Sequence, residues 1–139
     1  KVQPPLRGKY DVEALRKGIA DGTIDVIVSD HIPEDVENKV IEFDHAAFGM
    51  SSIETTFAMA NMCRGRVSLE KLIEKFSVNP RKILGIPIPQ IKKGEKANLT
   101  IFDPSHNFTL NLTDLKSKSK NNPLIGSKLK DNMAGHKGE

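Results

Sequence analysis

A short β-branched run, Ile24–Val28, constrains the fold more than any other part of the sequence, because it leads directly into Ser29, Asp30 and His31. Its nearly continuous apolar character is typical of a strand buried on both faces, as in a parallel sheet. A helix with apolar residues at helical spacing is predicted before it, over about residues 11–21, with Asp11 as N-cap and Gly22 closing its end. A helix followed by such a strand indicates an α/β protein.

The chain after this strand is predicted to form a long loop and then helices. Residues 32–52 are polar and irregular, and a loop of this length in a compact protein usually has a function. Helices are predicted over residues 53–62 and 68–76, the second capped by Ser68. A third is predicted to open with Asn79 as N-cap and Pro80 at its first position, and to end at Gly85.

The composition changes after Gly85. Alternating apolar residues predict half-buried strands over residues 97–102 and 108–112, separated by a turn at Asp103-Pro104. We therefore predict a domain boundary near residue 86, with one domain over residues 1–86 and a second over residues 87–139. The last residues, 131–139, show no period and are predicted to be frayed.

Charge and cysteine content exclude several function classes. The net charge is only +3, and the aromatic residues are six phenylalanines and one tyrosine, so nucleic acid is not an expected partner. The basic stretch from Lys116 to Lys120 is predicted to be an exposed loop. The single cysteine, Cys63, excludes an intramolecular disulfide and a cysteine-based zinc cluster, and is predicted to be a buried thiol on a helix. No apolar run is long enough to span a membrane, so a cytoplasmic protein is expected.

Asp30 is the first candidate for chemistry. A carboxylate directly after a buried strand lies at the end of the strand where α/β barrels hold their active sites, although aspartate also caps loops and helices. Successive residues of a strand point to opposite sides, so His31 is predicted to be structural. The four histidines form no closely spaced pair, and the chain therefore does not encode a complete zinc site by itself.

Several motifs, taken in order, are similar to those of dihydroorotases, which are metal-dependent cyclic amidohydrolases. The resemblance extends to about residue 130 and suggests that the chain corresponds to the C-terminal part of such an enzyme. The matching segments are Val2–Arg7, Asp21–His31, Ala47–Gly49, Glu54-Thr55, Ser68–Leu72, Asn79-Pro80, Lys93-Gly94, Ala97–Thr100 and Ser117–Asn121.

The resemblance implies a fold, a cofactor and a reaction. The fold would be the C-terminal part of a (β/α)8 barrel followed by strands of a small β-sandwich domain. Zinc is the implied cofactor, with Asp30 as a ligand and the remaining ligands upstream of Lys1. Asp30 would also take a proton from the metal-activated water that opens the ring of dihydroorotate to N-carbamoyl-L-aspartate. The chain alone is accordingly predicted to be inactive.

Substrate contacts are also implied, and two of them depart from the family pattern. The backbone at Phe48 and Gly49 matches the part that contacts the pyrimidine ring. Gln3 replaces an asparagine of the pattern, and Glu34 replaces a histidine. An ionised Glu34 beside a carboxylate substrate would cost roughly 4 kcal/mol at about 4 Å and an effective dielectric near 20.

These departures leave three hypotheses open. The first is a working dihydroorotase, with a homodimer as the expected assembly. The second is a catalytically silent dihydroorotase-like subunit that supports aspartate transcarbamoylase. The third is a related cyclic amidohydrolase, such as an allantoinase or dihydropyrimidinase, with a differently charged substrate.

Overall fold

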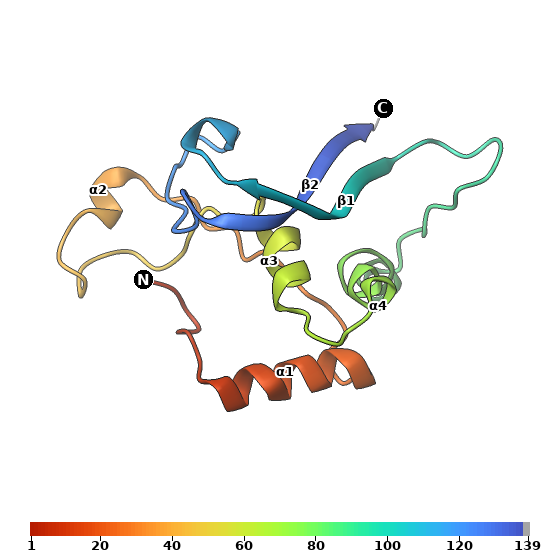
Figure 1. The fold of residues 1–139 in the computed structure, drawn as a ribbon, viewed down its shortest axis with the longest axis horizontal. Coiled ribbons are helices and arrows are strands. Elements are labelled where there is room, and N and C mark those ends of the chain that lie inside the picture. The colour runs from red at the N-terminus through yellow and green to blue at the C-terminus, as the bar shows by residue number, and fades with distance from the viewer. Residues whose placement is uncertain (138–139) are drawn as a thin grey trace.

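The computed structural model describes residues 1–137, and side chains as far as residue 130. A group of short helices is followed along the chain by a two-stranded sheet, which lies across α3, while α1 lies on the opposite side of α3 (Figure 1). The elements are α1 (Lys9–Asp21), α2 (Val36–Lys39), α3 (Thr56–Cys63), α4 (Leu69–Ile73), the π-helix η1 (Glu74–Val78), α5 (Asn79–Leu84), β1 (Leu99–Thr109), the 3-10 helix η2 (Leu112–Asp114) and β2 (Lys128–Lys137).

Helix α1 begins earlier than predicted. Gly8 is its N-cap, and Asp11 is the third helical residue, whose carboxylate accepts a hydrogen bond from the Gly8 amide at 3.2 Å. The prediction of Asp11 as N-cap was therefore wrong, although its carboxylate does satisfy a backbone amide at the start of the helix. The predicted end is confirmed, since Gly22 adopts the left-handed conformation with φ of 91°.

The predicted buried strand over residues 24–28 is extended but is not part of a sheet. The Val28 residue is 72% exposed, and the Ile27 amide donates to the carbonyl of Lys75 in η1 at 3.1 Å. The prediction of full burial was wrong for a physical reason. A strand of this kind is buried by parallel neighbours on both sides, and the described residues contain no parallel strand beside this one.

The helices after the loop follow the predicted order with shifted boundaries. Ser68 caps α4 as predicted, because its hydroxyl accepts from the Lys71 amide at 3.2 Å. Asn79 is not an N-cap, because η1 leads into α5 without interruption and its backbone is helical. Its side chain instead donates to the Asp25 carbonyl at 3.0 Å, which ties α5 to the extended segment. Gly85, with φ of 65°, ends the helix as predicted.

Strands β1 and β2 form an antiparallel pair from Leu99↔Lys137 to Thr109↔Lys128. The predicted turn at Asp103-Pro104 is instead a register irregularity inside the continuous strand β1. The prediction of frayed residues at the C-terminus was wrong for those in β2, and residues 138 and 139 lie outside the described part. A ladder is formed by backbone groups, so pairing does not require a side-chain period.

A small core holds α3 against this sheet. It consists of Ala58, Leu110, Leu115 and Leu129, all buried, with Met59, Phe108 and Leu124 packed against it. The Phe57 ring lies 5.7 Å from that of Phe76 and 4.8 Å from that of Phe102, in edge-to-face arrangements. Helix α3 thus contacts both η1 and β1 through one aromatic side chain.

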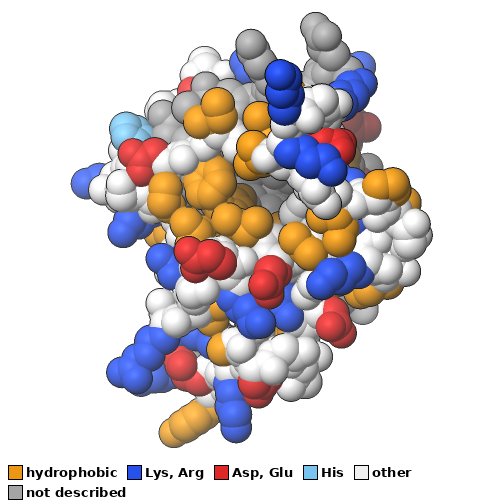
Figure 2. Space-filling view, turned by 90° about the vertical axis from the view of Figure 1, so that its right-hand side faces the viewer, with side chains coloured by type: hydrophobic (Ala, Val, Ile, Leu, Met, Phe, Trp, Pro, Cys, Tyr) orange, Lys and Arg blue, Asp and Glu red, His pale blue; other side chains and the backbone are white. Residues whose placement is uncertain are grey.

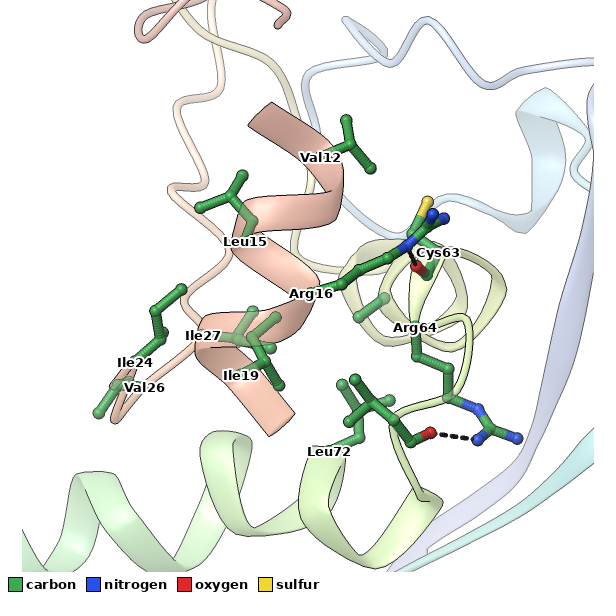
Figure 3. Close-up of a pocket in the computed structure, with 12 residues that line it drawn as sticks. Val12, Leu15, Arg16, Ile19, Ile24, Val26, Ile27, Cys63, Arg64 and Leu72 are labelled. Carbon is green, nitrogen blue, oxygen red and sulfur yellow. Dashed lines mark hydrogen bonds between the residues drawn. The ribbon is translucent and has the colours of Figure 1, made fainter. Parts of the chain in front are cut away.

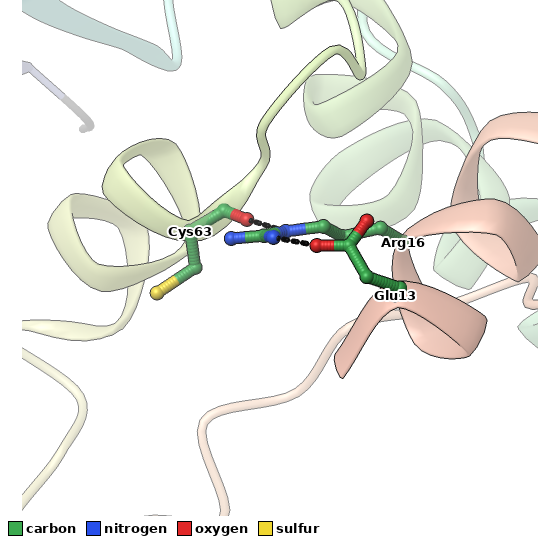
Figure 4. Close-up of polar contacts among 3 residues, drawn as sticks. All are labelled: Glu13, Arg16 and Cys63. Atoms are coloured by element: carbon green, nitrogen blue, oxygen red, sulfur yellow. Dashed lines mark hydrogen bonds and ion pairs between the residues drawn. The ribbon is translucent and has the colours of Figure 1, made fainter. Parts of the chain in front are cut away.

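Cys63 lies at the end of α3 and is exposed, so the prediction of a buried thiol was wrong. Its carbonyl accepts a hydrogen bond from Arg16 Nε at 2.6 Å, and Arg16 also pairs with Glu13 on α1 (Figure 4). This contact places the last turn of α3 against α1, and the thiol points away from it.

On one face of the molecule, hydrophobic side chains gather near the centre, with acidic and basic side chains interleaved around them (Figure 2). None of the helices in the described part of the chain has the length and apolar character needed to cross a membrane.

Candidate functional site

Asp30 ends the extended segment in an uncommon backbone conformation. Its φ is 47°, and within residues 1–137 no other residue except glycine has a positive φ. The left-handed region costs an L-residue roughly 1–2 kcal/mol, and aspartate tolerates it better than most. The residue is exposed. Residues in such sparsely populated backbone conformations cluster at functional sites, which makes Asp30 a candidate.

The residues on both sides of Asp30 fix it to the start of the next helical segment. The Ser29 carbonyl accepts from the Ser52 hydroxyl at 2.7 Å. His31 Nδ1 accepts from the amides of Ser52 at 3.0 Å and Ile53 at 3.2 Å. A neutral imidazole that accepts at Nδ1 carries its proton on Nε2. His31 is therefore an anchor for the loop, as the structural interpretation predicted.

Gly49 lies where only glycine fits. Its φ is 115°, and a Cβ added there would come within 2.5 Å of Ile32 Cβ. The close approach is part of a short parallel contact, in which the Ile32 amide donates to the Met50 carbonyl at 3.0 Å. The Gly49 amide donates to the Lys1 carbonyl at 3.0 Å, and the Gly49 carbonyl accepts from Lys39 and Asn121. Both backbone groups of Gly49 are thus used within the protein.

Phe48 is the member of the predicted pair that remains accessible. The residue is 46% exposed, and its ring lies 4.6 Å from Lys1 Nζ. Within the described part of the chain, both backbone groups of Gly49 make internal hydrogen bonds, whereas the amide and carbonyl of Phe48 make none.

Glu34 and Gln3 lie in different surroundings. Gln3 is exposed, whereas Glu34 is partly buried. Glu34 Oε2 accepts from Asn38 Nδ2 at 3.1 Å, and the Glu34 carbonyl accepts from the Ser119 hydroxyl at 2.7 Å. Glu34 also lines a cavity of about 290 Å³ together with Lys39 and with residues 118–121. Glu34 and Gly49 thus both make hydrogen bonds to the segment of residues 118–121. No hydrogen bond in the described part of the chain joins Asp30 or Gln3 to either of these two residues.

Sequence reasoning missed the segment that holds the loop from the other side, residues 116–122. Its lysines are exposed, as predicted, but its backbone is bound. The Glu54 carboxylate accepts from the amides of Lys116 and of Ser117, the latter at 3.1 Å. The buried Asn122 side chain donates to the Ser51 carbonyl at 2.8 Å and to Thr55 Oγ1 at 3.2 Å. Glu54 and Asn121 lie in motifs that are similar to those of dihydroorotases, and this similarity was the only sequence signal for the role of the segment.

An apolar cavity of about 420 Å³ lies between α1, the extended segment, α3 and α4 (Figure 3). Val12, Leu15 and Ile19 of α1 line it on one side, and Leu72 of α4 on another. Its lining carries no cluster of carboxylates or histidines, so it has the character of an incompletely filled core and not of a catalytic site.

The side chains that the structure describes, those of residues 1–130, do not form a complete metal centre. Among them, no group of three histidine, cysteine, aspartate or glutamate side chains could hold a metal ion. Asp30 fits a metal site in one respect, as a single exposed carboxylate at the end of an extended segment.

A family model described as "Amidohydrolase family" matches residues 5–133. Curated relatives include proteins named dihydroorotase from Syntrophus aciditrophicus, 40% identical over 94% of this chain, and from Carboxydothermus hydrogenoformans, 44% identical over 93% of it. The chain spans about 31% of the length of each.

The fold is also similar to solved structures. An L-hydantoinase (dihydropyrimidinase) from Arthrobacter aurescens is matched over 99% of this chain and 32% of its own, with a TM-score of 0.86 and 27% identity. A dihydropyrimidinase from Brevibacillus agri is matched over the same shares, with a TM-score of 0.84 and 22% identity, which supports the fold alone.

Proposed function

We propose that this chain, which belongs to the amidohydrolase family, is the Asp30-bearing part of a dihydroorotase. The observation that carries the proposal is the 40–44% identity to dihydroorotases over more than nine-tenths of the chain. The α/β amidohydrolase fold fits it. The activity is that of the full-length protein, since relatives are about three times as long.

Asp30 has the position and exposure needed for proton transfer. Its carboxylate accepts a proton from the attacking water, whose oxygen bonds to the ring amide carbon of dihydroorotate. The carbon–nitrogen bond of the ring then breaks, and Asp30 returns the proton to the leaving nitrogen, which gives N-carbamoyl-L-aspartate. The reverse sequence closes the ring. Asp30 is the one zinc ligand proposed in this chain, and a zinc ion held there would lower the pKa of the attacking water.

The finer architecture is part of the same proposal. Residues 1–86 would form the last strand, active-site loop and helices of the barrel, and residues 87–139 a segment of a β-sandwich. The exposure of Val28 supports this architecture, because a barrel strand without the neighbouring strands and helices leaves its side chains uncovered. Cytoplasmic location and a homodimer remain part of the proposal.

The ring-binding region is proposed to include the Phe48 and Gly49 backbone, Gln3 and Glu34. We expect the Glu34→His variant of the full-length protein to bind dihydroorotate more tightly, because it replaces an anion near an anionic substrate with a hydrogen-bond donor. The measurement is the KM for dihydroorotate, with Glu37→His as the control on the exposed face of α2. An unchanged KM in Glu34→His would show that charge repulsion at this residue does not limit binding.

Two other functions are favoured by single observations. Glu34 itself favours a silent subunit that supports aspartate transcarbamoylase, since its charge opposes that of the substrate. The structural similarity to hydantoinases favours a dihydropyrimidinase-like substrate, although the sequence identity to dihydroorotases is higher.

Ring-opening rates of the full-length protein distinguish the three functions. Dihydroorotate, dihydrouracil, hydantoin and allantoin are compared at equal concentration. A dihydroorotase opens dihydroorotate fastest. Preference for an uncharged ring would instead support the dihydropyrimidinase-like function, and a metal-loaded protein that opens none of them would support the silent subunit.

A further inference from the structure

Lys39, the last residue of α2, has an unusual set of partners for a lysine. Its ammonium group donates to the carbonyls of Ala47 at 2.7 Å, Gly49 at 2.9 Å and Lys1 at 3.4 Å. An ammonium has three donors, so all three have partners. The residue is partly buried, and none of the ion pairs in the described part of the chain includes it. Its charge is therefore stabilised by carbonyl dipoles and not by a carboxylate.

Two of these carbonyls flank Phe48. One ammonium group binds the residue before Phe48 and the residue after it, so it fixes the direction of the chain through Phe48 at two points. The third carbonyl, that of Lys1, also accepts the Gly49 amide at 3.0 Å, which closes the network. The Asn38 carbonyl of the same helix accepts the Ala47 amide at 2.9 Å. The end of α2 thus binds the residues on both sides of Phe48, and residues 47–49 form the loop tip.

Asn121 supplies a second hold on the same peptide. Its side chain donates to the Gly49 carbonyl at 3.2 Å, and its own carbonyl accepts the Ser51 amide at 2.7 Å. The Gly49 carbonyl therefore has two donors, an ammonium from α2 and an amide from the segment of residues 116–122. Two donors that share one acceptor are expected to be energetically coupled.

We propose that Lys39 is a positioning residue for substrate binding, with Asn121 as its partner, and that it acts by holding the Phe48 peptide groups toward the ring. This inference rests on the proposed function for its substrate. Lys39 does not touch the substrate, and its effect passes through the carbonyls of Ala47 and Gly49. Loss of the ammonium frees the loop tip and lowers the fraction of protein that is ready to bind.

The test is the Lys39→Met variant of the full-length protein, which keeps most of the apolar stem but removes the donors. The matched control is Lys82→Met, since Lys82 is an exposed lysine in the last turn of another helix, α5. We expect Lys39→Met to raise the KM for dihydroorotate about tenfold or more, in line with the loss of charge-assisted hydrogen bonds. The kcat is expected to change far less, and Lys82→Met to leave both constants unchanged.

A second measurement does not depend on activity. Hydrogen exchange in a peptide that covers residues 46–50 is expected to be faster in Lys39→Met than in Lys82→Met. Equal exchange and an equal KM in the two variants would overturn the inference. If wild-type protein opens no ring substrate, the proposed function and the binding role of Lys39 both fail, whereas normal wild-type activity with no KM effect overturns the inference alone.

Asn121→Ala provides a further variant if Lys39→Met does not fold. It is expected to raise the KM in the same direction, and the double variant to raise it by less than the product of the two single effects. Fully multiplicative effects would show that the two residues do not act through the same carbonyl. Lys39→Arg, which keeps the charge but not the compact donor geometry, is expected to have an intermediate KM.

Discussion

Asp21, Gly22 and Thr23 show how a short sequence pattern follows from local hydrogen bonding. The Asp21 carboxylate accepts from the Thr23 hydroxyl at 2.7 Å and from the Thr23 amide at 3.0 Å. These bonds, first that of the hydroxyl and then that of the amide, lower the pKa of Asp21 below its ordinary value. Gly22 between them takes the left-handed conformation that ends α1. The pattern thus turns the chain from the helix into the segment that leads to Asp30.

Replacing Thr23 with valine tests this account of the turn. Thr23→Val removes the hydroxyl donor, so we expect the pKa of Asp21 to rise toward its ordinary value. A lowered folded-state pKa contributes stability above the unfolded pKa, which is lost as pH falls through the folded value, so the variant should lose the hydroxyl's part of that contribution at neutral pH. The measurement is an NMR titration of labelled aspartate carboxyls. A pKa of Asp21 that is unchanged from that of the wild-type protein would contradict the part assigned to the hydroxyl.

Some residues with local partners were predicted correctly from the sequence, and residues with distant partners were not. Ser68 and Gly85 were predicted because a cap depends on residues within one turn, although the N-cap predictions for Asp11 and Asn79 were wrong. Asp30 was singled out by its position after an apolar run, and its role stays a prediction. Lys39 and Asn121 were not predicted as anchors, because their partners lie in other loops and leave no periodic trace in the sequence.

At the scale of elements, α3 connects the sheet to the helices. The buried Asn61 side chain donates to the carbonyls of Pro104 at 3.0 Å and Lys130 at 3.2 Å, one on each strand. Its own oxygen accepts from Arg64 Nε at 3.0 Å. The Pro104 carbonyl lies in the irregular part of β1, where the ladder is interrupted. Asn61 therefore supplies a donor where strand pairing does not.

Asn61→Ala is expected to destabilise the protein by about 1–3 kcal/mol, because it removes a buried side chain whose amide donates two partly buried hydrogen bonds to backbone carbonyls. The matched control is Asn107→Ala, an exposed amide on β1. The measurement is the free energy of unfolding of the full-length protein in urea. Equal unfolding free energies for the two variants would mean that water replaces the Asn61 hydrogen bonds at no cost.

Elements were predicted with uneven success for a physical reason. Helix α1 and the helices after the loop were found because their apolar residues recur within the element, whereas the four-residue helix α2 lies inside the predicted loop and was missed. Strand β2 was not, because its pairing with β1 depends on residues about 30 positions away and on backbone groups. The burial of residues 24–28 was predicted wrongly. Their apolar side chains suit a strand with parallel strands on both sides, and the described residues contain no such strands.

At the scale of the whole molecule, the chain exposes surfaces that suit packing against further protein. Val28 is 72% exposed and Leu6 93%, and an apolar cavity of about 420 Å³ lies between α1 and α3. Its matched relatives are about three times as long. Extensive exposed apolar surface is unusual in an independent domain. We therefore expect ring-opening activity from the full-length protein and none from these 139 residues alone.

The most direct test is the rate of dihydroorotate ring opening by the full-length Asp30→Asn variant. The amide keeps the shape of the side chain but cannot accept the proton, so we expect kcat to fall by about 10²-fold or more. Asp35→Asn, at the exposed N-cap of α2, is the matched control and should retain wild-type kcat. The unfolding midpoint of Asp30→Asn should match that of wild type. Normal turnover in Asp30→Asn would contradict the assigned role of Asp30.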